Sequence, residues 1–268
     1  MRRGWENKVD LGLQGQWVLV TGASKGIGLG AAVAFAREGC HLHLTARSAD
    51  GLEEARQAVL AENDVEVHTH PLDLSVTANL EKLAANCGDI DILINNAGDI
   101  PAGSLDMVSE EEWRRGWDLK VFGYINLTRL IYAGMKSRGH GVIINDIGNA
   151  GERLDFDYIS GSTGNASLMA FSRALGGRSL DDGIRVVGVN PGMVQTERMT
   201  KLLKARALKL YGDEGRHAEL LDRYPMGRGA TVEELADLMV FLASPRSSYT
   251  SGCVVTLDGG VSSRHSIV

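Results

Sequence analysis

Thr21-Gly22-Ala23-Ser24-Lys25-Gly26-Ile27-Gly28 is the stretch of sequence that decides the fold. It follows the apolar run 17–20, which predicts a β-strand, and it opens a helical pattern. In this context Gly22 allows a tight turn, Gly26 lets the backbone approach a pyrophosphate, and Gly28 allows close packing of helix on strand. The N-terminus of the helix offers unpaired N–H groups and a positive dipole to phosphates. The stretch therefore predicts a nicotinamide dinucleotide site on a Rossmann-type fold.

Strand-like and helix-like segments alternate along the rest of the chain. The expected strands are 17–20, 41–45, 65–68, 90–94, 142–145, 184–189 and 254–257, and the expected helices are 26–38, 50–62, 76–86, 109–137, 162–178 and the helix from its N-cap Thr231 to Ala243. Such alternation predicts a parallel sheet with helices on both faces. Because the 268 residues contain no linker, repeat or low-complexity tract, we expect one α/β domain over 1–268.

The composition is that of an ordinary globular protein, with 44% hydrophobic and 23% charged residues. The net charge of −6 argues against nucleic acid or an anionic membrane as a partner. Cys40, Cys87 and Cys253 are far apart in the sequence, so we expect neither disulfides nor a metal site. No apolar stretch follows the paired N-terminal arginines, and none is long enough to span a bilayer. We therefore expect no export signal and a cytoplasmic location.

The end of the second strand distinguishes between the two nicotinamide cofactors. An acidic residue there would bind a ribose 2′-hydroxyl, whereas an arginine would accommodate a 2′-phosphate. This strand ends in Thr45-Ala46-Arg47, without an acid, and Lys25 adds a second cation in the glycine-rich stretch. An arginine can make a bidentate, charged contact to a phosphate. We therefore predict NADP(H) in preference to NAD(H); in the alternative, both cations are solvated surface side chains.

Further motifs accompany the glycine-rich stretch. They are Asp73-Leu74, Asn95-Asn96-Ala97-Gly98, Asn190-Pro191-Gly192 followed by Thr196, and Leu257-Asp258-Gly259-Gly260. With these motifs the chain resembles the short-chain dehydrogenases/reductases over nearly its whole length. The resemblance implies a doubly wound, seven-stranded parallel sheet and a homo-oligomer, either a dimer or a tetramer.

The resemblance also implies how the cofactor is held. Asp73-Leu74 would hold the adenine, Asn96 to Gly98 would abut the cofactor, and Thr196 would reach the nicotinamide amide. The full set of predicted cofactor-binding residues is Gly22, Ser24, Lys25, Gly26, Ile27, Gly28, Arg47, Asp73, Leu74, Asn96, Ala97, Gly98, Asn165, Pro191, Gly192 and Thr196.

The catalytic positions that the resemblance implies are changed in this chain. The chemistry of the family rests on an asparagine, a serine, a tyrosine and a lysine, of which the tyrosine exchanges the carbonyl proton and the lysine lowers its pKa. Local anchors in the sequence put Lys120, Gly148, Gly161 and Asn165 at these four positions. Neither glycine can transfer a proton, so ketone reduction cannot follow the usual route. Asn165 could still bind a ribose hydroxyl.

Three nearby side chains could replace the missing groups. Asp146 ends a strand that should be buried, where a carboxylate needs a partner, and Lys120 is a candidate. We hypothesise that Lys120, with Tyr158 or Asp146, supplies proton transfer or substrate anchoring. In the alternative, Lys120 and Asp146 form a structural ion pair. Tyr158 lies three residues before Gly161, so we expect it to point elsewhere unless the backbone is rearranged; its alternative role is a packed loop aromatic.

The segment 193–224, rich in lysine, arginine and leucine, is expected to be a helical insertion and the natural substrate lid. Its cations Lys201, Lys204, Arg206 and Lys209 could attract an acidic substrate or form a solvated helix face. The first functional hypothesis is an NADP(H)-dependent oxidoreductase for a small molecule, with a remodelled active site. A lyase or isomerase built around Lys120, and a sensor that binds NADP(H) without turnover, are the alternatives.

Overall fold

The computed structural model describes residues 9–264, and the expectation about an export signal concerns residues outside this range. The central feature is a sheet of seven parallel strands in the order β3-β2-β1-β4-β5-β6-β7. The strands are β1 (Trp17–Thr21), β2 (His41–Ala46), β3 (Val67–Pro71), β4 (Ile92–Asn95), β5 (Gly141–Asp146), β6 (Ile184–Pro191) and β7 (Cys253–Leu257). The strand order reverses between β1 and β4, and ligands of open α/β sheets bind beyond the carboxyl ends of strands at such a point.

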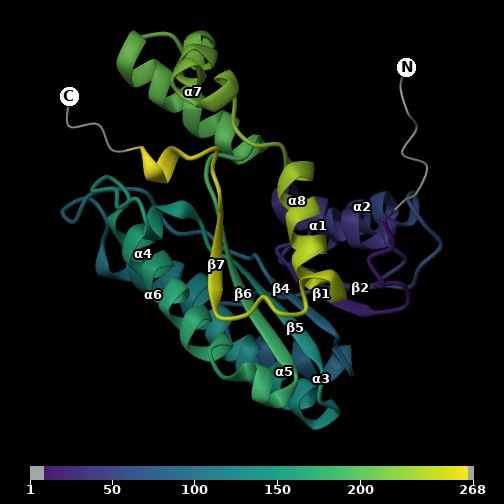
Figure 1. The fold of residues 1–268 in the computed structure, drawn as a ribbon. Coiled ribbons are helices and arrows are strands. Elements are labelled where there is room, and N and C mark those ends of the chain that lie inside the picture. The colour runs from purple at the N-terminus through teal and green to yellow at the C-terminus, as the bar shows by residue number, and fades with distance from the viewer. Residues whose placement is uncertain (1–8, 265–268) are drawn as a thin grey trace.

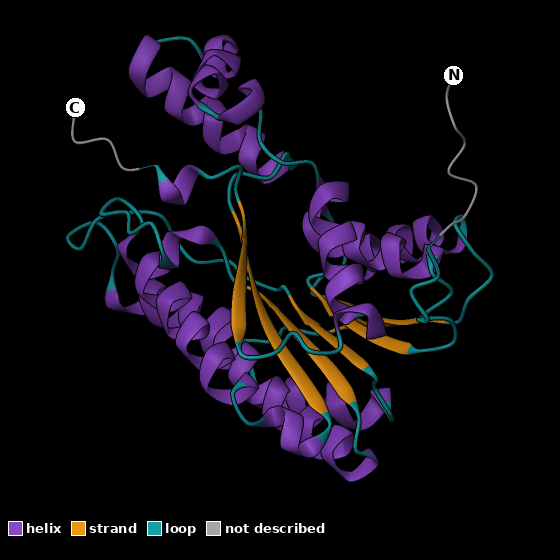
Figure 2. Ribbon diagram, in the orientation of Figure 1, coloured by secondary structure: helices purple, strands orange, loops and turns teal. Residues whose placement is uncertain are grey.

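Helices cover both faces of the sheet, as Figures 1 and 2 show. The helices α1 (Gly26–Arg37), α2 (Ala49–Leu60) and α8 (Val232–Ala243) share one apolar core with β1, β2, β4, β5 and β6. On the other face, α3 (Thr77–Cys87) and α5 (Gly123–Arg138) share a second core with the sheet, and α6 (Ile159–Gly176) lies beside them. The predicted single, doubly wound α/β domain is confirmed.

Several predicted elements have other bounds in the structure, and the third strand and the long helix are two of them. The third strand spans Val67–Pro71 instead of 65–68, because it is an edge strand and can therefore end in a proline, which has no N–H to donate. The helix predicted over 109–137 is divided into α4 (Glu110–Trp117), a π-helical turn at Asp118–Phe122, and α5. A π-helical turn inserts one residue into the helical repeat without a proline, so the hydrophobic pattern barely records it.

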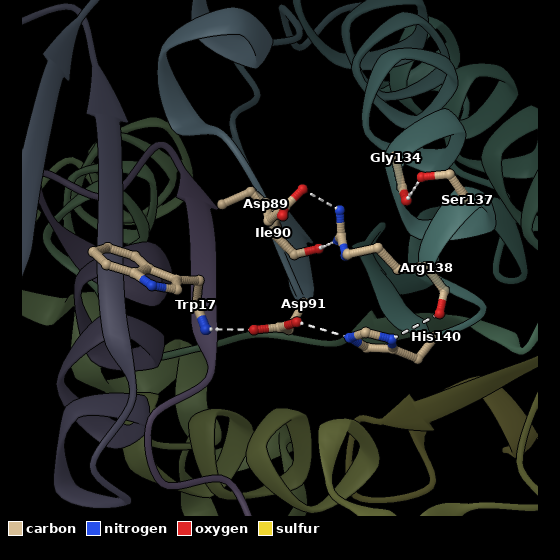
Figure 3. A network of polar contacts seen from close by, with 8 residues as sticks. All are labelled: Trp17, Asp89, Ile90, Asp91, Gly134, Ser137, Arg138 and His140. Carbon is tan, nitrogen blue, oxygen red and sulfur yellow. Dashed lines mark hydrogen bonds and ion pairs between the residues drawn. The ribbon is translucent and has the colours of Figure 1, made fainter.

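A polar network fastens the sheet at the end opposite the glycine-rich stretch (Figure 3). The carboxylate of Asp91 accepts a hydrogen bond from the Trp17 backbone N–H at 2.8 Å and lies 3.1 Å from Nε2 of His140. Arg138, the last residue of α5, donates to Asp89 and to the Ile90 carbonyl. These contacts join the starts of β1 and β4 to the end of α5 and fix where Trp17 enters the sheet.

The predicted helical insertion is present as α7 (Glu197–Tyr211) and a 3-10 segment at Glu214–Arg223. The two pack on each other and stand above the end of the sheet to which β6 and β7 lead (Figure 1). Of the four lid cations named from the sequence, Lys201, Arg206 and Lys209 are exposed, whereas Lys204 is half-buried. None of the helices among residues 9–264 is long and apolar enough to cross a membrane.

Candidate active site

The glycine-rich stretch forms the turn between β1 and α1. Gly22 and Gly26 have φ values of 67° and 58°, a left-handed conformation that favours glycine. A Cβ atom on Gly28 would lie 2.4 Å from the Gly22 carbonyl oxygen, so the helix packs against the turn only because Gly28 has no side chain. Lys25 is the N-cap of α1, and its exposed side chain makes no capping hydrogen bond. The first N–H groups of α1 are therefore free of a side-chain cap.

The turn is fastened to the end of β4. The Asn96 side chain donates to the Thr21 carbonyl at 2.7 Å. The Thr21 hydroxyl accepts from the backbone N–H groups of Asn96 and Ala97, at 2.8 and 3.0 Å. A Cβ on Gly22 would lie 2.8 Å from the Asn96 amide nitrogen. Residues 21–22 and 96–97 thus form one rigid rim at the switch point between β1 and β4, the place where a dinucleotide pyrophosphate binds in this fold.

The predicted 2′-phosphate ligand, Arg47, lies beyond the end of β2 with its side chain about two-thirds exposed. Its guanidinium is 3.8 Å from the carboxylate of Asp99, which follows the Asn95–Gly98 motif. Asp73 accepts hydrogen bonds from the backbone and hydroxyl of Ser75, and these bonds, with a smaller effect of Arg47, lower its pKa. Arg47 thus faces two carboxylates and is within reach of solvent.

The motifs after β6 and β7 lie against each other. The Gly192 N–H donates to the Leu257 carbonyl at 2.9 Å, and a Cβ on Gly192 would lie 2.6 Å from Cβ of Asp258. Thr196 caps α7 through a hydrogen bond from the Met199 N–H. The Thr196 methyl group would lie 3.6 Å from a Cβ on Gly26. The start of α7 therefore lies against the glycine-rich turn.

Lys120 projects from the π-helical turn, and its side chain is partly buried. Its ammonium donates to the Ile147 carbonyl, and its Cδ would lie 3.0 Å from a Cβ on Gly98. Burial lowers the pKa of Lys120 to about 8, with the charge of Asp146 opposing that shift. Across residues 9–264, no ion pair joins Lys120 to Asp146, so the anticipated direct pair is replaced by a hydrogen bond to the backbone and a longer-range attraction.

Asp146, the last residue of β5, is buried, and its Oδ1 has no hydrogen-bond partner among the described residues. Burial raises the pKa of this carboxyl to about 7, while the charge of Lys120 opposes the shift. Its backbone carbonyl accepts a hydrogen bond from the hydroxyl of buried Tyr124 at 2.9 Å. Buried Asp146 and half-buried Lys120 thus both have pKa values shifted toward neutral pH.

Gly148, which the resemblance puts at the serine position, is in contact with Asn165. Gly148 has a φ of 114°, and its carbonyl accepts a hydrogen bond from the Asn165 amide at 3.3 Å. Oδ1 of Asn165 is buried with no partner among the described residues. Two acceptor oxygens, on Asn165 and Asp146, are therefore available in this region for a donor such as a ribose or substrate hydroxyl.

Tyr158 does not point away from Gly161, contrary to the sequence-based expectation. Its ring atoms Cε1 and Cζ lie 2.0 and 2.1 Å from where a Cβ on Gly161 would be. Tyr158 is the N-cap of α6 and Gly161 lies in the first turn, so a side chain from the N-cap can lie over the backbone three residues later. Glycine at 161 leaves room for the ring without a rearranged helix.

Sequence reasoning missed Arg198 in the first turn of α7. Its guanidinium donates to the carbonyls of Gly98 and Ile100 at 3.2 and 3.4 Å and lies 3.8 Å from Asp99. Burial raises the pKa of Tyr158, and the positive charge of Arg198 opposes this shift. Arg198 also lowers the pKa of Lys120. Nothing in its local sequence sets Arg198 apart from the other cations of 193–224; only its place where α7 meets residues 98–100 does.

Comparisons with known proteins agree with this architecture. The family model for enoyl-(acyl carrier protein) reductase matches residues 22–262. The 2-keto-3-deoxy-L-fuconate dehydrogenase of Xanthomonas campestris pv. campestris is 34% identical over 251 residues, covering 92% of this chain and 80% of that protein. The 3-oxoacyl-[acyl-carrier-protein] reductase of Escherichia coli (strain K12) is 30% identical over 255 residues, with 94% and 99% covered.

The fold is also similar to that of a solved reductase structure. The L-sorbose reductase from Gluconobacter frateurii, complexed with NADPH and L-sorbose, superposes with a TM-score of 0.89 at 32% identity, covering 96% of this chain and 100% of that one. These relatives are named as reductases or dehydrogenases. The chain therefore belongs to the short-chain dehydrogenase/reductase family.

Proposed function

We propose that the protein is an NADP(H)-dependent oxidoreductase that interconverts a carbonyl and an alcohol on a small molecule, with Tyr158 as the proton-transferring acid. The observation that carries this proposal is the position of the Tyr158 ring over Gly161. The family resemblance puts Gly161 at the position of the tyrosine, and the ring of Tyr158 lies in the space beside it. The acid is therefore supplied from the helix N-cap instead of from the helix interior.

The surrounding residues of the chain suit proton transfer by this phenol. The charge of Arg198 favours the phenolate of Tyr158, a role that the family gives to its lysine. Lys120 holds a proton close to the Ile147 carbonyl, and its pKa of about 8 allows proton exchange near neutral pH. Asp146 opposes the loss of that proton through its own charge. We assign Tyr158 as catalytic, and Lys120 and Asp146 as residues that hold and position the exchangeable proton.

The residues present fit a nicotinamide dinucleotide. The uncapped N-terminus of α1 and the close approach at Gly22 and Gly26 suit a pyrophosphate, and the unpaired Oδ1 of Asn165 suits a ribose hydroxyl. When bound, the cofactor supplies or accepts the hydride. We propose a preference for NADP(H), because Arg47 is the charged group beyond β2 and is exposed enough to meet a 2′-phosphate. The L-sorbose reductase relative was solved with NADPH.

The decisive experiment measures oxidation and reduction of the nicotinamide by absorbance over a panel of sugar ketones, keto acids, β-keto thioesters and the matching alcohols. Once a substrate is found, Tyr158→Phe removes only the phenolic hydroxyl, and we expect kcat to fall while the cofactor still binds. Tyr249→Phe is the matched control, because Tyr249 is 96% exposed. Full turnover by the Tyr158→Phe variant would refute the role of Tyr158.

A second candidate function rests on the lowered pKa of Lys120. An amine with a pKa of about 8 is partly unprotonated near neutral pH and can attack a carbonyl to form a Schiff base. A lyase or isomerase would use it so, with the dinucleotide as a structural part. Borohydride trapping of a substrate adduct on wild type, absent in Lys120→Met, would favour this function. Substrate turnover that consumes reduced nicotinamide without a trapped adduct would favour the oxidoreductase.

We also propose that the chain forms a homodimer or homotetramer in the cytoplasm and that α7 with residues 214–223 closes over the substrate. The support for the lid is that Arg198 and Thr196, at its start, touch the residues beside the glycine-rich turn. The support for assembly is the family resemblance. Light scattering after size-exclusion chromatography measures the oligomer, and protease protection of residues 197–223 by cofactor with substrate tests closure.

A further inference from the structure

Two histidines and a cysteine from three elements meet beneath the β2–β3 edge of the sheet. His43 lies on β2, His70 on β3, and Cys87 is the last residue of α3. Nδ1 of His43 is 2.9 Å from Nε2 of His70, and Sγ of Cys87 is 3.8 Å from that same nitrogen. Each residue offers one ligand atom, and all three atoms lie within 4.8 Å of one another.

Neighbouring rings hold the cluster in place. The Trp17 ring lies 4.8 Å from the His43 ring, and His68 stacks on the same imidazole at 5.1 Å. The polar network of Figure 3 fixes the Trp17 backbone, and the Thr45 hydroxyl donates to the His70 carbonyl at 2.9 Å. His43 and Cys87 are buried, whereas His70 is half-buried and gives the cluster a path to solvent. The fold of the chain by itself thus holds the side chains of His43, His70 and Cys87 close together.

We propose that His43, His70 and Cys87 bind one zinc-like divalent cation, with a water molecule as the fourth ligand. Imidazole and thiolate are the ligands that Zn²⁺ prefers, and three protein ligands plus water are common in open tetrahedral sites. With Zn–N of about 2.0 Å and Zn–S of about 2.3 Å, adjacent ligand atoms in a tetrahedron lie roughly 3.3–3.6 Å apart. The separations of 2.9 and 3.8 Å bracket this range, and all three atoms lie within 4.8 Å of one another, so side-chain rotations bring them to a common ion.

Binding of the cation to these ligands requires the loss or transfer of protons from the side chains. Each imidazole binds a metal through a nitrogen that carries no proton and has a free lone pair. The Cys87 sulfur binds as the thiolate, so the thiol gives up its proton when the metal–sulfur bond forms. Binding breaks the His43–His70 hydrogen bond, and its proton moves to the other nitrogen of the donor ring. Two metal–nitrogen bonds and one metal–sulfur bond form, and the thiol releases one proton to solvent.

The experiment titrates the chelator-treated full-length protein with Co²⁺, whose thiolate complexes show a sulfur-to-metal charge-transfer band, and then displaces Co²⁺ with Zn²⁺. We expect one ion per chain, one proton released, and a rise in unfolding temperature with Zn²⁺, since a ligand of the folded state stabilises it. Cys87→Ser should abolish the charge-transfer band. His70→Gln should weaken binding by about tenfold or more.

Matched controls come from the same residue types elsewhere in the chain. Cys253→Ser on β7 and His217→Gln in the 3-10 segment 214–223 should leave the band and the affinity unchanged. A wild-type titration without a charge-transfer band or a released proton would overturn the proposal, and so would an unchanged band in Cys87→Ser. The wild-type titration decides the matter even if a variant does not fold. All readouts are independent of catalytic activity, so the fate of the proposed oxidoreductase function does not affect them.

Discussion

The ring of Tyr158 fills the space in which the side chain of residue 161 would begin, and Gly161 is the residue that permits it. The nearest ring atom lies 2.0 Å from the position of a Cβ on residue 161, a separation that no side chain could keep. The phenol and the glycine are therefore one structural unit.

This unit predicts a coupling between the two positions. Gly161→Ala should destabilise the protein by about 1–3 kcal/mol, because the added methyl group overpacks a buried site. In a Tyr158→Ala background the same change should cost nothing, or stabilise α6 by up to about 1 kcal/mol, since alanine favours a helix over glycine. Urea unfolding of the four proteins of this cycle measures the coupling. An equal cost in both backgrounds would show that the ring is seated elsewhere.

A second prediction concerns the packing of α1 on the glycine-rich turn. Gly28→Ala should destabilise the chain by about 1–3 kcal/mol and weaken dinucleotide binding, because its Cβ would lie 2.4 Å from a backbone carbonyl that cannot give way. Gly134→Ala in α5 is the control: its Cβ meets only the flexible end of Arg138, at 3.3 Å. That variant should keep cofactor affinity. Thermal unfolding and cofactor fluorescence titration compare the two, and equal behaviour would contradict the prediction.

A third prediction concerns the choice of cofactor. Arg47→Ala should raise the Kd for NADP(H) about 10- to 100-fold, as expected for one lost charged hydrogen-bonding group, and leave the Kd for NAD(H) nearly unchanged. Arg56→Ala, on the neighbouring helix α2 and bonded to Glu53, should change neither constant. Calorimetric titration with both cofactors measures the four constants. Tighter binding of NAD(H) than of NADP(H) by the wild type would overturn the assigned preference.

A fourth prediction concerns pH. The pKa of Asp146 is about 7 in the folded chain against an ordinary value of 3.8, so between these values the folded state holds a proton that the unfolded state has lost. The contribution of Asp146 to the free energy of unfolding therefore falls as pH rises from about 4 to 7, by at most about 1.4 kcal/mol per pH unit. Asp146→Asn should remove this fall, whereas exposed Asp64→Asn should retain it. Identical pH profiles for wild type and Asp146→Asn would refute the shift.

The contribution of Lys120 to the free energy of unfolding changes with pH in the opposite direction. Its folded-state pKa of about 8 lies below the ordinary 10.5, so the unfolded chain binds the extra proton between these values, and stability rises with pH over that range. The summed contribution of Asp146 and Lys120 to the free energy of unfolding thus has its minimum between about pH 7 and 8.

The sequence predicted the sheet, its helices and the glycine-rich turn well, because each follows from local periodicity and from short motifs with a backbone requirement. The N-cap at Thr231 is an example. Its capping box with Glu234 needs only residues 231–234, and it is present in the structure. The π-helical turn that carries Lys120 was not predicted, since its one-residue insertion leaves the hydrophobic pattern nearly intact.

The contacts of the candidate site depend on residues far apart in the chain, and sequence reasoning located them less well. The direction of the Tyr158 ring follows from its place at the N-cap of α6. The predicted start of this helix at residue 162 was three residues too late, so the prediction left Tyr158 outside the helix. Arg198 reaches Gly98 across a hundred residues of sequence. The histidine–cysteine cluster was missed because spacing rules consider cysteines along the chain, whereas neighbouring strands bring His43 and His70 together.

The pairing of Tyr158 with Gly161 also constrains the order in which this chain could have diverged. A lineage with an aromatic residue already at 161 could not have acquired the inward-facing ring of Tyr158, since both rings would need the same volume. The side chain at 161 had to be lost before, or together with, the seating of the new phenol. A single substitution that introduces tyrosine at position 161 meets an occupied site, so the ring at 158 would have to be lost first or in the same step.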